Sequence, residues 1–124
     1  MALVLWVVYS CICGVVEGIL YHSHTRTDKR VDEHGYYTIQ RVIVGLGMFW
    51  HEPALLIYAG FVFPFFHDGM YYETRRYLNS SIYRGGFFTD LPMGSSAIFS
   101  FGIITRVMFF VVGCSWAMIY VFSK

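Results

Sequence analysis

The stretch AIFSFGIITRVMFFVVGCSWAMIYVF, from Ala97 to Phe122, decides the structural class of this chain. Its only charged side chain is that of Arg106. The stretch exceeds the about 20 apolar residues that a helix needs to cross a hydrocarbon core of about 30 Å. A guanidinium near the middle of such a helix costs about 2.5 kcal/mol or more in lipid, so we expect Arg106 to face other helices or water.

The composition of the whole chain indicates the same class. Of its 124 residues, 56% are hydrophobic and 14% are charged, whereas soluble domains carry about 25% charged residues. Aromatic residues make up 20%, which is typical of proteins whose Tyr and Trp side chains line membrane interfaces. The net charge of +1 gives no indication of a nucleic-acid partner. We predict an all-α integral membrane protein with a single membrane domain, residues 1–124.

Two further apolar regions complete the predicted architecture. Residues 2–21 and 42–66 are each long enough to cross a bilayer, so with 97–122 we expect about three transmembrane helices. Polar connections are expected at 22–41 and 67–96. The first connection carries more basic residues than the second, which favours a cytoplasmic position for it.

The second region is interrupted by His51, Glu52 and Pro53. Proline removes a backbone donor and kinks or breaks a helix. A re-entrant loop that turns at Pro53 is the alternative, and it requires the turn to be buried in protein. The sequence leaves the kink and the re-entrant loop both open.

Four ionisable residues fall inside the predicted spans. A helical rise of about 1.5 Å per residue places Glu17 and the pair His51–Glu52 at nearly the same depth. Arg106 lies deeper, but its long side chain can reach toward either carboxylate. We therefore expect a buried polar cluster, which either locks the helices together or forms a functional pathway. Its members are Glu17, His51, Glu52 and Arg106.

The end of the second predicted span is rich in aromatic and polar residues. We expect these side chains to anchor the helix at the headgroup level of the bilayer. The alternative is an interfacial site for a polar headgroup or a metal ion. The residues concerned are His67, Asp68, Tyr71, Tyr72 and Glu73.

A metal site has weak support in the sequence. His51-Glu52 begins like the H-E-x-x-H motif of metalloproteases, but position 55 is Leu55 and not histidine. Other histidines match no compact zinc spacing. We expect no metal and no cofactor. If a metal were bound, its candidate ligands would be His22, His24, His51 and His67.

Gly14 and Gly18 form a small-x-x-x-small motif in the first predicted span. Such pairs let helix backbones approach closely in membranes. We expect this face to seat a neighbouring helix or a second copy of the chain.

The segments FPFFHDGMYYETRRYLN (Phe63 to Asn79) and IYRGGFFTD (Ile82 to Asp90) resemble small uncharacterised multi-pass membrane proteins of Bacteroidetes-type genomes and their prophages. The resemblance implies a bacterial or phage-encoded protein of the inner membrane. It brings no activity, cofactor or residue role with it.

The function expected from the sequence is assembly in the membrane, as a homo-oligomer or as a subunit of a larger complex, without enzymatic activity. Partners would be the lipid bilayer and other membrane subunits. One alternative is a small channel, transporter or phage-type permeabilising protein with a polar pathway through the bilayer. A second alternative is a metal-dependent membrane hydrolase.

Overall fold

The computed structural model describes residues 1–23, 33–89 and 101–124, with the side chains of 21–23 and 33–34 left out. All regular structure in these residues is helical, so the protein is all-α, as predicted. The described helices are α1 (Ala2–Ser23), α2 (Glu33–Met48), α3 (Leu55–Leu78) and α4 (Ile103–Phe122).

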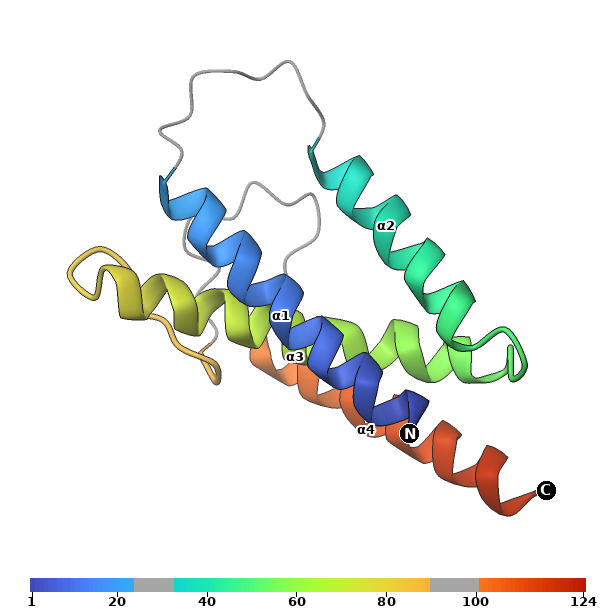
Figure 1. Cartoon of the computed structure of the whole chain (residues 1–124). Coiled ribbons are helices and arrows are strands. Elements are labelled where there is room, and N and C mark those ends of the chain that lie inside the picture. The colour runs from blue at the N-terminus through green and yellow to red at the C-terminus, as the bar shows by residue number, and fades with distance from the viewer. Residues whose placement is uncertain (24–32, 90–100) are drawn as a thin grey trace.

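Helix α3 lies between α1 and α4, and it forms the centre of the fold (Figure 1). Helices α1 and α3 run parallel, because Trp6 near the start of α1 donates a hydrogen bond of 2.9 Å to the carbonyl of Ala59 near the start of α3. Helix α4 runs antiparallel to α3, because Trp116 near its end donates a bond of 2.8 Å to the carbonyl of Ala54. The two chain termini consequently lie at one end of the molecule (Figure 1).

The core forms at this end of the bundle, around the indole ring of Trp6. The ring packs against Phe49 at a centroid distance of 5.9 Å and against Phe63 at the same distance. Aromatic pairs at this spacing stabilise a core beyond the area that they bury. The buried apolar residues of the cluster are Trp6, Phe49, Leu55, Tyr58, Ala59, Val62 and Ala117.

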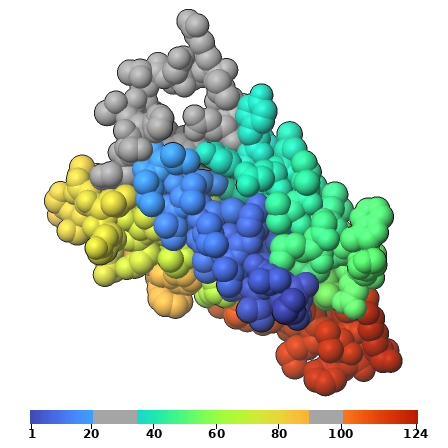
Figure 2. Space-filling model, in the orientation of Figure 1, coloured from blue at the N-terminus to red at the C-terminus, as the bar shows by residue number. Residues whose placement is uncertain are grey.

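Helix α2 is peripheral and packs sparsely against α1 and α3 (Figure 1). It lies along the outer side of α1 (Figure 2). One close approach is at Gly45, since a Cβ atom there would lie 3.3 Å from the ring of Trp6. The attachment of α2 therefore depends on a few contacts.

The kinked single helix predicted at 42–66 is wrong, and the alternative, a chain that turns at Pro53, is closer to the structure. Helix α2 ends at Met48 and α3 begins at Leu55, and a turn with a bond from the amide of Glu52 to the carbonyl of Phe49 joins them. The chain therefore reverses direction before Pro53 instead of kinking there. Proline disfavours helical geometry in the residue that precedes it, which accounts for the break.

Both predicted polar connections also contain helix. Residues 33–41 belong to α2 and residues 67–78 belong to α3. Hydropathy alone assigned them to polar connections between spans, but Arg41 and Asp68 take part in ion pairs within the helical bundle. Pro64 lies inside α3.

Among the residues that the structure describes, two helices are long and apolar enough to cross a membrane. They are Ala2–Leu20, with a mean hydropathy of 2.2, and Ile103–Phe122, with a mean hydropathy of 1.7. The first agrees with the predicted span at 2–21. The second agrees with the later part of the span predicted at 97–122, whose residues 97–100 lie outside the described part of the chain.

Candidate functional site

Four ionisable side chains from three helices meet beside α3, and we call them the charge cluster: Glu17 of α1, Arg41 of α2, and His67 and Asp68 of α3. The Glu17 carboxylate pairs with the Arg41 guanidinium. Its other oxygen lies 3.2 Å from Nε2 of His67. Nδ1 of His67 lies 2.8 Å from Oδ1 of Asp68. The imidazole therefore stands between two carboxylates.

The charge cluster is withdrawn from the surface. Glu17 and His67 are only 6% and 8% exposed. Arg41 also lies over the ring of Phe63, with 4.8 Å between its guanidinium carbon and the ring centroid, which adds a cation–π contact. The cluster links α2 to α1 and α3 at a point where α2 otherwise has few contacts.

The glycines of α1 position Glu17. Gly14 lies one turn before the carboxylate and Gly18 lies directly after it. A Cβ atom at Gly14 would meet the carbonyl oxygen of His67 and lie 3.0 Å from the amide nitrogen of Tyr71. Their missing side chains let α1 approach the backbone of α3, which brings Glu17 within reach of His67.

Arg41 was not identified as a site residue from the sequence. It fell at the end of a predicted polar connection and was expected to lie in water. The available signal was its position one turn after Tyr37, at the start of an apolar run. A basic residue there can extend back toward a carboxylate on another helix.

Arg106 is fully buried at a different place. Its Nη2 donates hydrogen bonds of 3.1 Å to the carbonyl oxygens of Phe87 and Thr89. The guanidinium carbon lies 5.6 Å from the centroid of the Tyr72 ring. Arg106 thus fastens the segment after α3 against α4 and α3.

The predicted cluster of Glu17, His51, Glu52 and Arg106 does not form as one unit. His51 is exposed in the turn between α2 and α3. Glu52 pairs with Lys124 at 2.6 Å in an exposed position. The prediction of buried positions for His51 and Glu52 is wrong because the break between α2 and α3 moves both residues to the end of the bundle.

Most residues expected as interfacial anchors lie between helices. His67, Tyr71 and Tyr72 are buried, and the Tyr71 hydroxyl accepts a hydrogen bond of 2.7 Å from Arg75. Asp68 is half-buried in the charge cluster. The Glu73 carboxylate accepts a bond of 3.0 Å from the amide of Phe87.

The metal-ligand candidates are dispersed in the part of the chain that is described. His51 lies in the turn and His67 lies in the charge cluster. The side chain of His22 and all of His24 lie outside the described residues. Within the described residues, no group of three or more His, Cys, Asp or Glu side chains is arranged to hold a metal ion.

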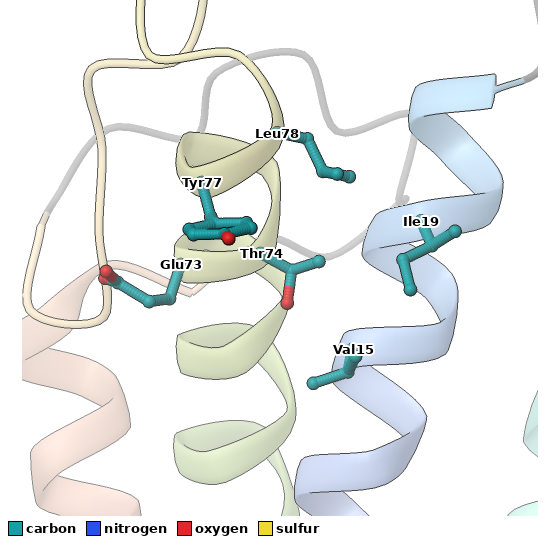
Figure 3. A pocket seen from close by; sticks show the side chains of 6 residues that line it. All are labelled: Val15, Ile19, Glu73, Thr74, Tyr77 and Leu78. Carbon is teal, nitrogen blue, oxygen red and sulfur yellow. The ribbon is translucent and has the colours of Figure 1, made fainter.

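A hollow of about 390 Å³ lies between the later turns of α1 and α3 (Figure 3). Its wall is mainly apolar and it opens outward, which suits hydrocarbon chains better than a polar ligand. The lining residues are Val15, Ile19, Glu73, Thr74, Tyr77 and Leu78.

The helical glycines fall into two groups. A Cβ atom at Gly14, Gly18, Gly45, Gly69 or Gly113 would come within 3.4 Å of another part of the protein. At Gly47 of α2 and Gly60 of α3, a Cβ atom would meet nothing within 4 Å. Both of these open glycines are exposed.

No protein-family model, curated protein or solved structure matches this chain. Two features of the described residues bear on the function, the charge cluster and the open glycines on exposed helix faces.

Proposed function

We propose that this chain is a small helical protein of a bacterial inner membrane that works by associating with further copies of itself. Support for the membrane location comes from α1 and α4. Only 28% and 17% of their apolar windows are buried within the protein. An apolar helix in the core of a soluble protein would be mostly buried, whereas one that faces lipid is exposed.

The proposed association rests mainly on the open space around Gly47 and Gly60. Glycine in a helix costs about 1 kcal/mol relative to alanine. At Gly14 and Gly113 the close approach of another helix offsets this cost, because a side chain there would clash. A helix of a second copy at Gly47 and Gly60 would supply the same compensation, since membrane helices associate through small residues.

The apolar surroundings of these glycines favour a helix as the partner. Ile57, one turn before Gly60, is 43% exposed, and Leu46, next to Gly47, is 45% exposed. A second copy would place side chains in van der Waals contact with the glycine backbone. Such packing is the principal driving force for helix association in lipid.

The channel alternative has less support. Its proposed lining consisted of Glu17, His51, Glu52 and Arg106. Glu17 is engaged with Arg41 and His67, and Arg106 with two carbonyl groups. His51 and Glu52 lie in an exposed turn. The four residues thus do not line a common path through the bundle.

Bulky substitutions at the open glycines test the proposed association. We expect the purified wild-type chain to form dimers or larger species in lipid nanodiscs, and Gly47→Leu or Gly60→Leu to shift it toward monomer. Cross-linking and native mass spectrometry measure the distribution. Val111→Leu is the matched control, because Val111 is 54% exposed on α4 and the change also adds apolar bulk.

Circular dichroism establishes whether each variant retains its helix content. Folded leucine variants that associate as strongly as the wild type would show that these faces are not the interface. A wild-type chain that stays monomeric at all protein-to-lipid ratios would refute the proposed function itself.

A further inference from the structure

We propose that the charge cluster is a reversible proton-binding site in which His67 accepts the proton between the carboxylates of Glu17 and Asp68. This inference does not depend on the proposed association. It rests on the position of the imidazole, whose two nitrogens lie 3.2 Å and 2.8 Å from carboxylate oxygens on different helices.

The geometry provides partners for His67 in both protonation states. In the neutral state, Nδ1–H donates to Asp68, and Nε2 accepts from Nη2 of Arg41 at 3.1 Å. After protonation, Nε2–H donates to Glu17 instead, and Nδ1–H keeps its bond to Asp68. Arg41 still donates to the other oxygen of Glu17. No polar atom of the imidazole loses its partner when the proton arrives.

The charge balance supports proton uptake. Two carboxylates and one guanidinium leave the cluster with one excess negative charge when His67 is neutral. An imidazolium cancels this charge. Because an uncompensated charge is costly in a buried site, a proton is the simplest ligand that neutralises the cluster without displacing a helix.

The other polar and charged groups near the cluster lie on the helices that pack around it. Burial opposes the imidazolium most strongly and holds the pKa of His67 below its ordinary value, and Arg41 acts in the same direction. Glu17 and Asp68 favour the charged form. Tyr71 stacks near His67 on α3, with 6.5 Å between ring centroids. On the α4 side, the guanidinium of Arg106 lies over the ring of Tyr72. The groups near Arg41 are Tyr9 and Cys13 of α1, and Tyr37 of α2.

Nitrogen NMR of ¹⁵N-histidine-labelled protein in lipid nanodiscs tests the proposal. The Nδ1 and Nε2 shifts report whether an imidazole is protonated. We expect the His67 signal, assigned by its loss in His67→Gln, to change from neutral to protonated between pH 9 and pH 4.

Single substitutions should shift the His67 titration in opposite directions. Glu17→Gln or Asp68→Asn removes a negative charge, so we expect the midpoint to fall by about one pH unit or more. Arg41→Met removes a positive charge, so the midpoint should rise. A common shift of the same sign in all three variants would indicate altered folding and overturn the assigned roles.

The wild-type titration decides the matter even if a variant fails to fold. A His67 signal that stays neutral throughout the range would overturn the proton-binding site. The proposed association would be unaffected by that result, since its test depends on Gly47 and Gly60.

Discussion

A comparison of alanine substitutions at Gly14 and Gly60 measures how much the close contact between α1 and α3 contributes to the effect of an added methyl group on the free energy of unfolding. Both changes add one methyl group to a helix, so both gain about 1 kcal/mol of helix propensity. At Gly60 the methyl group meets nothing within 4 Å. At Gly14 it lies 3.0 Å from Cβ of Met70 and 3.0 Å from the amide nitrogen of Tyr71, and it also meets the carbonyl of His67.

The two substitutions should therefore have opposite effects on the free energy of unfolding. Non-bonded carbon atoms prefer separations of about 3.5–4.0 Å. Two of the three neighbours of Gly14 are backbone atoms of α3 that cannot rotate away, so α1 must shift as a whole. Overpacking of this kind costs about 1–3 kcal/mol. We expect Gly60→Ala to stabilise the monomer by up to about 1 kcal/mol, and Gly14→Ala to be less stable than Gly60→Ala by about 1–3 kcal/mol.

Unfolding by sodium dodecyl sulfate in mixed micelles measures both values. The protein is kept dilute so that it is monomeric, and the fluorescence of tryptophan, including the buried Trp6, follows the loss of packing. Equal shifts in the two unfolding curves would refute the reasoning, because they would mean that α1 and α3 do not approach each other at Gly14. A destabilised Gly60→Ala monomer would show that the space around Gly60 is occupied.

Three further predictions concern other contacts. Trp6→Phe should lower the free energy of unfolding by about 1–3 kcal/mol, because it removes a buried hydrogen bond and part of a core ring. The same mixed-micelle titration measures this free energy. Arg106→Met should release the segment after α3, so trypsin should cleave faster after the exposed Arg84, and an unchanged rate would contradict the anchoring role. The hydrogen bond from Lys124 to Glu52 raises the pKa of the Lys124 ammonium. The pair therefore stabilises the folded protein fully below the ordinary lysine pKa of about 10.4, and this stabilisation is lost as the pH rises above the raised pKa. Glu52→Gln should lower that pKa in a ¹⁵N-lysine titration, and no change would show that the pair does not form.

The sequence by itself determined the class of structure. Long apolar runs that contain few charges satisfy their backbone groups only as helices when water is absent. The spans predicted at 2–21 and 97–122 correspond to α1 and α4 because hydropathy and length are local properties of the chain. The glycines of α1 were also recognisable, since the spacing of Gly14 and Gly18 places both on one helix face.

The number and direction of the helices required the tertiary structure. Hydropathy merged the apolar end of α2 with the apolar start of α3, because the intervening turn, residues 49–54, is short. The additional helix reverses the direction of every element that follows it. The sequence therefore placed Arg106 on a helix expected to run parallel to α1. In the structure, α4 runs antiparallel to α3 and hence to α1.

Only the tertiary structure decided which charges meet. Glu17 pairs with Arg41 and His67 instead of Arg106, because these partners lie on helices whose faces and directions no local pattern specifies. A buried charge requires a partner, so the sequence could predict that Glu17 and Arg106 are compensated. The identity of each partner depends on contacts between residues that are distant in the chain, and those contacts are set by how the helices pack.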